Sequence, residues 1–471
     1  MRKGRAHRRR QQRRLRQGRT VQGDSGRPCI DKTWSDLRSW CKARGMPKTK
    51  LTLAYFPDTF RGMMATKDMG TGEDIVRVPE SLLITASKVK RLLASDRTIP
   101  WTLSEHQSLT CWLYTESEKR ARSEWHMYID SLPRDFASVP LFTLSGTVPA
   151  SNIAMDTREA SWIMGHLPYS VQQKVGEQHE RLYRDWVSTC RFLEELGLEA
   201  LVAWRRYVWA WLAVNTRCIH LGQPASSKDS MALAPILDFL NHSEQADVTT
   251  FYDSKSSQFV IRTNRPFRKG QEVFISYGPH DNRFMLLEYG FVLRQNPYQV
   301  LELDHAVCAW VDAVKSRSKA AKRPGAGLMQ PADIDALIAT LKQHSLWGDY
   351  TISLDDLEPS YRLHAALRLL LPAEQRDVTS KQAIALWDRW RRGSAADSMA
   401  DGHSADLAMQ KAISAWVGAV CQGLSKLSQR MLAETALSSQ PADAVDGFLV
   451  QCLHTVWLEI SSIAERCLDK M

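Results

Sequence analysis

The chain alternates between two patterns of hydrophobic and polar positions. Residues 51–85 and 232–292 hold short apolar pieces broken by glycine and proline, a pattern typical of small curled strands. Residues 86–221 and the chain beyond residue 300 carry apolar positions at helical spacing instead. The order strand-rich, helical, strand-rich, helical predicts an α+β fold. In this fold the two strand-rich segments form one discontinuous domain around a helical insertion.

Two helices and two loops follow from the same pattern. Residues 33–43 place their apolar side chains on one face and begin at a threonine, a common helix cap. Residues 195–215 hold the most regular helical pattern of the insertion. The low-complexity stretches at 319–327 and 393–405 predict loops between later helices.

The second strand-rich segment contains three recognisable strands. Residues 248–252 and 258–263 alternate around the polar stretch DSKSS, which predicts a hairpin. Residues 272–277 follow a turn at Lys269-Gly270 and predict a third strand. The strand-rich segment is therefore expected to end close to residue 292.

Composition places the charge of the protein in its N-terminal tail. The chain has 471 residues, which is enough for a large core and for two or three domains. The formal net charge is +10, and ten Lys and Arg residues lie in the first twenty positions without any Asp or Glu. The remaining chain is balanced, with 52 basic and 52 acidic residues. Such a tail is expected to be disordered. It fits a nuclear-localisation signal, a nucleic-acid contact or a merely solvated arm.

The cysteine pattern argues against metal binding and secretion. Nine cysteines are dispersed without a CxxC pair, and no HExxH motif occurs, so we expect reduced thiols and no zinc site. The apolar run at residues 207–216 lies between two arginines and is too short to cross a membrane. Reduced thiols also weaken the interpretation of Asn241-His242-Ser243 as a glycosylation acceptor, which requires secretion.

Three short polar elements are the candidates for chemistry. They are Phe60-Arg61-Gly62-Met63, Asn241-His242 after the apolar LDFL, and Tyr277-Gly278 after the strand VFIS. Each one alone is a weak signal, because Asn-His pairs end many chain segments and Tyr-Gly closes many strands. Their order along the chain is more informative than any one of them.

The order and setting of these elements resemble the SET-domain protein methyltransferases. The stretches VNTRCIHL, LAPILDFLNHS, RKGQEVFISYGPHDN and LEYGFVLRQNP are similar to the subgroup that includes the Rubisco large-subunit lysine methyltransferases. Specific motifs support the resemblance over residues 30–300. After residue 300 only the helical pattern of apolar positions supports it. The resemblance implies a discontinuous SET β-fold of small curled sheets with a knot-like closure. It also implies a helical insertion and a separate all-α C-terminal domain.

The implied domains are a basic tail at 1–28, a SET domain at 29–300 and a helical substrate-binding domain at 301–471. The implied activity is S-adenosylmethionine-dependent protein-lysine N-methylation. A histone lysine is the expected substrate, with nucleic-acid contact only through the tail and a location in nucleus and cytoplasm. A non-catalytic SET scaffold and a protein-histidine methyltransferase remain as alternatives.

The resemblance also assigns roles to individual residues. Tyr277 is the catalytic residue, whose hydroxyl aligns the substrate amine. The cofactor-binding residues are Phe60, Arg61, Gly62, Met63, Arg217, Asn241, His242 and Tyr277. The substrate-binding residues are Arg217, Asp238 and Tyr277.

Two of these assignments have a physical argument beside them. Gly62 lacks a Cβ, which would let its backbone approach the amino-acid end of S-adenosylmethionine closely. Arg217 has an alternative interpretation as a cation at a helix C-terminus, where the helix dipole favours positive charge. No metal ligand is assigned.

Overall fold

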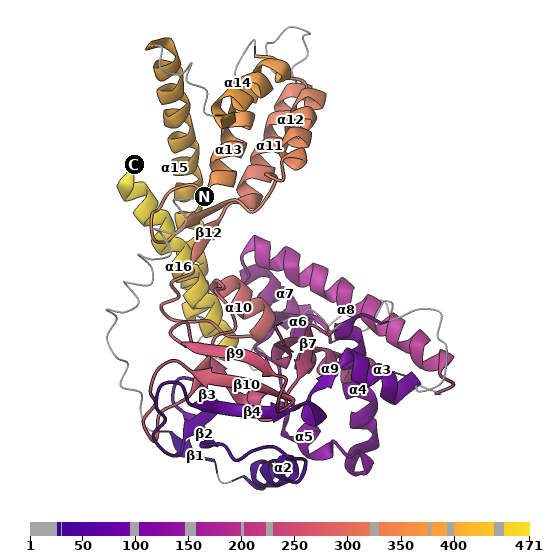
Figure 1. Ribbon diagram of the computed structural model, residues 1–471. Coiled ribbons are helices and arrows are strands. Elements are labelled where there is room, and N and C mark those ends of the chain that lie inside the picture. The colour runs from indigo at the N-terminus through magenta and orange to yellow at the C-terminus, as the bar shows by residue number, and fades with distance from the viewer. Residues whose placement is uncertain are drawn as a thin grey trace. The chain divides into compact units, whose positions relative to one another are not determined.

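The protein is described by a computed structural model, in which helices and short strands are interleaved along the chain (Figure 1). The structure describes residues 26–29, 31–94, 103–146, 157–198, 202–222, 229–320, 329–374, 378–392, 400–437 and 447–471. The basic tail predicted at 1–28 lies outside this range up to residue 25. The loop predicted at 319–327 lies outside it from residue 321.

The chain divides into two compact units. The first comprises Met1–Phe136, Leu144–Met155 and Gln178–Pro279, and the second comprises Ala137–Thr143, Asp156–Glu177 and His280–Met471. This division differs from the sequence-based boundary at residue 300. It falls earlier because α10 (Asn282–Tyr289) and β12 (Val300–Glu302) pack against the C-terminal helix α16 (Gly447–Lys470).

The described strands of the first unit are short and form four small sheets. They are β1 (Arg27–Pro28), β2 (Leu51–Phe56), β3 (Phe60–Ala65), β4 (Asp74–Pro79), β5 (Ile84–Thr85), β6 (Ile219–His220), β7 (Met231–Leu233), β8 (Asn241–His242), β9 (Val248–Asp253), β10 (Gln258–Thr263) and β11 (Phe274–Ile275). The sheet orders are β1-β2-β3, β4-β10-β9, β5-β7-β6 and β11-β8. Strands from before and after the insertion therefore share sheets, as the discontinuous arrangement requires.

The predicted strands of the second segment are largely confirmed. β9 and β10 form the expected antiparallel hairpin, with Gln258 opposite Asp253. The strand predicted at 272–277 shortens to β11, which pairs in parallel with β8. This pairing places Phe274 opposite Asn241 and Ile275 opposite His242.

The helices of the first unit carry its largest buried side chains. They are α2 (Lys32–Ala43), α3 (Ala86–Ala94), α4 (Glu105–Lys119), α5 (His126–Ser131), α9 (Trp204–Arg217) and the part of α8 (Tyr169–Glu195) from Gln178 on. Helices α6 (Pro140–Leu144) and α7 (Thr157–His166) belong largely to the second unit. Helix α4 packs against α9, and Trp112 and Trp211 are fully buried in these helices. The insertion thus supplies a core beside the small sheets, which are too short to hold one alone.

Two helix predictions need correction at their ends. The helix predicted at 33–43 is confirmed as α2, but its cap is the Asp31 side chain, which accepts the Thr33 N–H at 2.9 Å. The single helix predicted at 195–215 is wrong. Gly197 adopts a φ of 67°, in the left-handed region that commonly terminates a helix, and α8 ends there before α9 begins.

The second unit is mainly helical. It contains α10 and α16 together with α11 (Asp304–Ala320), α12 (Pro331–Gln343), α13 (Tyr361–Leu370), α14 (Ser380–Arg392) and α15 (Ala400–Leu437), and its strands are β12 and β13 (Thr351–Ser353). The loop predicted at 393–405 is wrong from residue 400, where α15 begins. A helix that is already nucleated extends through weak helix formers such as glycine and serine, which dominated the prediction.

Helix α16 is long and apolar enough to cross a membrane by length and composition alone. Within the structure, however, 56% of its most apolar window is buried, and it packs along α15. The expectation of no membrane span considers residues 207–216 alone, whereas α16 is a longer apolar segment. Its burial is that of a core helix in the second unit.

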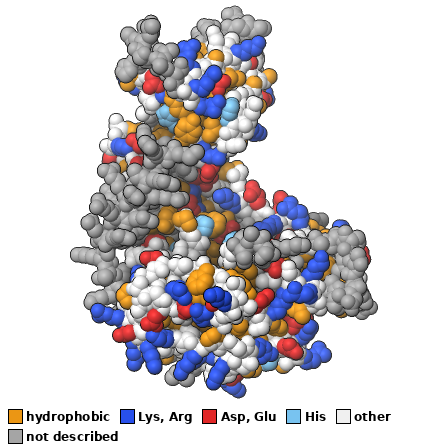
Figure 2. All heavy atoms as spheres, viewed as in Figure 1, with side chains coloured by type: hydrophobic (Ala, Val, Ile, Leu, Met, Phe, Trp, Pro, Cys, Tyr) orange, Lys and Arg blue, Asp and Glu red, His pale blue; other side chains and the backbone are white. Residues whose placement is uncertain are grey.

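On the face in view, basic and acidic side chains are interspersed (Figure 2).

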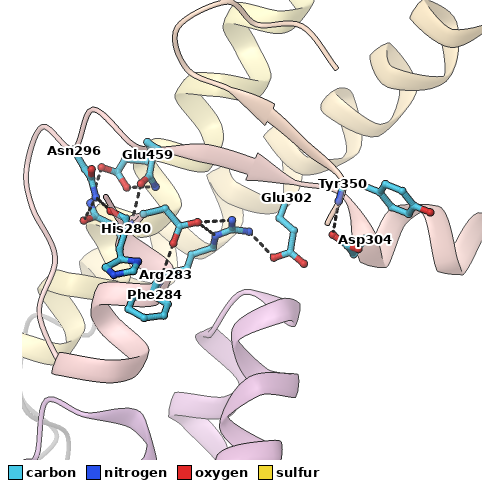
Figure 3. A network of polar contacts seen from close by, with 11 residues as sticks. His280, Arg283, Phe284, Asn296, Glu302, Asp304, Tyr350 and Glu459 are labelled. Carbon is cyan, nitrogen blue, oxygen red and sulfur yellow. Dashed lines mark hydrogen bonds and ion pairs between the residues drawn. The ribbon is translucent and has the colours of Figure 1, made fainter. Parts of the chain in front are cut away.

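A polar network ties α16 to the start of α10 (Figure 3). The Glu459 carboxylate accepts hydrogen bonds from the side-chain amides of Asn282, at 2.8 Å, and Gln299. The pKa of Glu459 is raised to about 8, chiefly by burial; the Asn282 hydrogen bond and the charge of Arg283 oppose the shift, and the charge of Asp281 adds to it. Both donors are neutral amides, so their hydrogen bonds do not require the Glu459 carboxyl group to be charged.

We expect the stability of the α16 contact to fall as the pH rises. The pKa of Glu459 lies above its usual value of 4.5 in the folded state, so folding favours the protonated form. Its contribution is complete below about pH 4.5 and is lost as the pH approaches 8, by on the order of 2 kcal/mol after allowing for solvent screening. Hydrogen–deuterium exchange of α16 at several pH values measures this.

Glu459→Gln is the matching variant, because glutamine has no proton to release in this range. Its protection factor in α16, in which the intrinsic pH dependence of amide exchange is divided out, is expected to stay constant between about pH 5 and 8. The same pH slope in both proteins would show that Glu459 does not titrate in the folded state as described.

Candidate functional site

The three candidate elements of the sequence meet in the first unit. The Asn241 Nδ2 donates to the main-chain oxygen of Arg61 in β3 at 2.9 Å. The main-chain N–H of Tyr277 donates to the Nδ1 of His242 in β8 at 3.0 Å. Residues that are 180 and 35 positions apart in sequence are thus joined by direct hydrogen bonds. The structure therefore brings the predicted site residues of these elements together.

Asn241 is held in one orientation by two near acceptors, and the Thr59 main-chain oxygen lies farther away at 3.5 Å. Its Nδ2 donates to the Arg61 oxygen and to Glu272 Oε1, the second at 2.8 Å. A main-chain carbonyl and a carboxylate only accept hydrogen bonds, so the side-chain nitrogen must face both of them. The Oδ1 atom consequently points away from these partners and is presented as an acceptor.

His242 acts here as a hydrogen-bond acceptor within a buried pocket. Its side chain is buried, and its ring centroid lies 5.2 Å from that of Tyr277. An imidazole nitrogen that accepts an N–H carries no proton of its own, whereas an imidazolium donates from both nitrogens. The contact therefore requires the neutral ring, and His242 supports the Tyr277 backbone through an unprotonated Nδ1.

Tyr277 is fixed at its main chain and at its hydroxyl. The hydroxyl donates to the main-chain oxygen of Leu240 at 2.9 Å, just before β8. A phenolic oxygen that donates its proton still has lone pairs for an incoming N–H. The arrangement can thus hold an amine in a defined direction, because hydrogen bonds at both the main chain and the hydroxyl fix the position of the Tyr277 oxygen.

Two guanidinium groups lie on the ring of Phe239. The Cζ atoms of Arg61 and Arg217 are 5.2 and 5.5 Å from its ring centroid. Burial, followed by the charge of Arg217, lowers the pKa of Arg61. Arg217 is the last residue of α9, so the dipole interpretation of its position is also met. The cluster concentrates positive charge beside β3.

The side chain of Asp238 is enclosed by its neighbours. Its side chain has no exposed area, and its Oδ2 accepts the Tyr128 hydroxyl at 2.8 Å. Burial raises its pKa to about 6, while Arg217 opposes the shift. Arg217 Nη1 donates to the Asp238 main-chain oxygen at 2.7 Å. The Asp238 carboxylate is thus enclosed and supports Arg217 and Tyr128, and its substrate-binding role stays a prediction.

Phe60 and Met63 lie at opposite extremes of exposure. Phe60 begins β3 after the turn from β2, has a φ of 57° and is 58% exposed. Met63 is fully buried, and its main-chain oxygen accepts the N–H of Val273 at 2.8 Å. The structure brings both into the strand that Asn241 contacts. Their cofactor-binding role stays a prediction.

Gly62 gives room to a residue that the sequence did not single out. An ideal Cβ on Gly62 would lie 2.1 Å from Glu272 Oε1 and 2.9 Å from Asn241 Nδ2. Glu272 also accepts the Thr59 hydroxyl at 2.5 Å, and burial raises its pKa. Glu272 and Thr59 are thus part of the site. The available signal, a carboxylate next to the apolar run VFI, is equally typical of a surface turn.

The described residues contain no group of three or more His, Cys, Asp or Glu that could hold a metal ion. The side chains that converge on β3 and β8 are amides, a phenol, an imidazole and guanidiniums. Such a set suits an organic ligand with both a carboxylate and hydrogen-bond donors. It does not resemble the all-oxygen or sulfur and nitrogen sets of metal centres.

Comparison with known proteins agrees with this arrangement. A family model of the SET domain matches residues 61–278, which spans β3, β8 and Tyr277. The solved structure of the SET domain of LSMT bound to lysine and AdoHcy is similar, with a TM-score of 0.57 at 15% identity, over 94% of each chain. The chain belongs to the SET-domain family of protein methyltransferases. The predicted α+β SET fold is thereby confirmed.

Two curated relatives extend over most of the chain. The chain is 32% identical over 399 residues to SET domain-containing protein 4 of Mus musculus, which covers 81% of this chain and 82% of that protein. It is 26% identical over 341 residues to a ribosomal lysine N-methyltransferase of Schizosaccharomyces pombe, over 72% of this chain and 75% of that protein.

We expect a methyl group at position 62 to disrupt the site. Gly62→Ala places a Cβ in the space of the Glu272 carboxylate, so that the carboxylate and the Asn241 amide must both move. Overpacking of this kind costs about 1–3 kcal/mol. Chemical denaturation of the first unit measures the loss.

Gly70→Ala is the matched control, since an ideal Cβ there meets only Glu73 Oε1, at an ordinary 3.4 Å. Its effect on the free energy of unfolding is expected to stay within about 0.5 kcal/mol. Equal losses in the two variants would contradict the close packing at Gly62.

Proposed function

We propose that the protein is an S-adenosylmethionine-dependent protein-lysine N-methyltransferase. The observation that carries this proposal is the placement of Tyr277. Its main chain is fixed on His242, and its hydroxyl is fixed on the Leu240 oxygen beside Asn241. Membership of the SET-domain family supports the same activity. So do the relative named as a ribosomal lysine N-methyltransferase and the similar structure bound to lysine and AdoHcy.

The residues of the site fit the chemical groups of S-adenosylmethionine. The Asn241 Oδ1, turned away from its two protein acceptors, suits the ammonium group of the cofactor. The guanidiniums of Arg61 and Arg217 suit its carboxylate, because the closest contact of Arg217 is to a main-chain carbonyl at 2.7 Å and its ion pair with Asp238 is longer, at 3.9 Å. When bound, the cofactor supplies an electrophilic methyl group on a sulfonium.

The residues of this chain would then prepare the lysine amine. A lysine side chain is protonated in water, and it must lose a proton before it can attack. Enclosure at the site and a nearby cation both lower the pKa of the amine. The Tyr277 oxygen accepts an N–H of the amine and directs its lone pair, so that fixed geometry supplies much of the rate. The ammonium proton would pass to water before the attack, and the nitrogen–methyl bond would then form as the carbon–sulfur bond breaks.

A histone lysine is our proposed substrate, and we propose a location in both nucleus and cytoplasm. Ten basic residues in the first twenty positions support approach to an anionic assembly such as a nucleosome. A ribosomal-protein lysine is the second candidate. The relative of Schizosaccharomyces pombe is named for that activity, and a ribosome is equally anionic. Radiolabel transfer to isolated nucleosomes and ribosomes, followed by mass spectrometry of the modified residue, decides between them.

Two measurements separate the methyltransferase proposal from its alternatives. Calorimetry with S-adenosylmethionine and with its demethylated product separates an enzyme from a non-catalytic scaffold, because a scaffold gives no heat with either. Mass spectrometry of the labelled residue separates lysine from histidine as the acceptor. A labelled histidine with unlabelled lysines would replace our proposal by histidine methylation.

Tyr277→Phe is expected to lower methyl transfer at saturating cofactor by about a hundredfold or more, because the amine loses its aligning acceptor. Cofactor affinity measured by calorimetry should change little, since the ring and the main-chain contact to His242 remain. Tyr252→Phe is the matched control, because its hydroxyl bonds Glu80 at an exposed site. Unchanged turnover in the Tyr277 variant would remove Tyr277 from the catalytic role.

Deletion of residues 1–20 tests the location and the role of the tail. We expect the shortened protein to leave the nucleus and to methylate nucleosomes with a weaker dependence on salt, since fewer cations then meet phosphates. Its cofactor affinity should match that of the full chain. Nuclear accumulation that survives the deletion would refute the localisation role.

A further inference from the structure

Glu272 joins three segments that form the site. Its Oε1 accepts from Asn241 Nδ2 at 2.8 Å, and its Oε2 accepts from Thr59 Oγ1 at 2.5 Å. Thr59 lies in the turn between β2 and β3, and Asn241 opens β8. The main chain of Glu272 forms a bridge with Met64 of β3. One carboxylate therefore connects the β2–β3 turn, β8 and the approach to β11.

The position of this carboxylate is reserved by the backbone. The ideal Cβ of Gly62 would overlap Glu272 Oε1 at 2.1 Å, so no other residue type leaves the same space. In β3, Arg61 presents its main-chain oxygen to the second proton of the Asn241 amide. Glu272 and the Arg61 oxygen are the two near acceptors of the amide, the Thr59 main-chain oxygen lies farther away at 3.5 Å, and the direction of Oδ1 follows from them.

We infer that Glu272 is a positioning residue of the cofactor site, which orients Asn241 without touching the cofactor. This inference rests on the proposed function. Both partners of the carboxylate are neutral donors, an amide and a hydroxyl, so the role requires acceptor oxygens and not a negative charge. A glutamine at this position keeps one acceptor for Asn241. Its amide can donate to Thr59, whose hydroxyl oxygen also accepts.

The test compares two variants at position 272 in the full chain. Glu272→Ala leaves the Asn241 amide with only one near acceptor, the Arg61 oxygen, and is expected to raise the Kd for S-adenosylmethionine about tenfold. Glu272→Gln is expected to stay within about threefold of the original Kd, because an acceptor remains. Calorimetry measures both values. Methyl transfer at saturating cofactor should recover in both variants, since the fault lies in binding.

Glu116 provides a matched control elsewhere in the first unit. It is also a buried glutamate with two hydrogen-bonded side chains, Ser123 and Lys119, both at 2.5 Å. Glu116→Ala is expected to lower the unfolding temperature but to leave the Kd for the cofactor unchanged. A general loss of stability would weaken cofactor binding in both alanine variants alike.

A double variant tests whether Glu272 acts through Asn241. If Glu272 only orients Asn241, the pair Asn241→Ala with Glu272→Ala binds the cofactor as weakly as Asn241→Ala alone. Additive losses would overturn the inference, and so would a Glu272→Gln variant as impaired as Glu272→Ala. Thr59→Val covers the case of an alanine variant that fails to fold. It removes one partner of the carboxylate and is expected to raise the Kd by less than Glu272→Ala does.

The outcomes separate this inference from the proposed function. Cofactor binding by the unaltered protein together with unchanged binding by Glu272→Ala would overturn the positioning role and leave the methyltransferase proposal standing. No heat from the unaltered protein with S-adenosylmethionine or its demethylated product would overturn the methyltransferase proposal and this inference with it.

Discussion

The site depends on the parallel pairing of β8 with β11, two strands of two residues each. Main-chain bonds over so short a distance are weak support for a sheet. Two further hydrogen bonds hold these segments together, one from the Tyr277 N–H to His242 and one from the Tyr277 hydroxyl to the Leu240 oxygen. The position of a ligand held by Tyr277 therefore depends on the neutral imidazole of His242 and on the main-chain carbonyl of Leu240.

The remaining structure supplies the stiffness that these short strands lack. Trp112 and Trp211 are fully buried on the packed helices α4 and α9, and α9 ends at Arg217 beside Phe239. The enclosed Asp238 then links Tyr128 of α5 to the segment before β8. The insertion is thus part of the site's support, because it delivers a cation and a buried hydrogen-bond donor to it.

Local patterns predicted the elements but not their partners. The hairpin of β9 and β10 was readable because alternation and a polar turn are local signals. The motifs around Asn241 and Tyr277 were readable only through their resemblance to a family. The Glu272 contact to Thr59 spans 213 positions, and no periodicity reports a contact at that separation. The burial of Asp238 was missed for the same reason, since Tyr128 lies 110 residues away.

Helix ends were the other source of error. The apolar spacing of 195–215 continues across a break that a single left-handed glycine makes, and spacing alone does not register backbone conformation. The cap at Asp31 shows the same limitation, because aspartate and threonine are both common caps and only the bond to the Thr33 N–H distinguishes them.

The absent side chain at Gly62 and the carboxylate of Glu272 occupy one shared volume. Any larger residue at position 62 must be accompanied by a smaller one at position 272, so position 62 is exchangeable only together with position 272. Among related sequences they are expected to change together, although 210 positions separate them in the chain. The glycine is thus half of a two-residue unit, and its neighbour in space determines what can replace it.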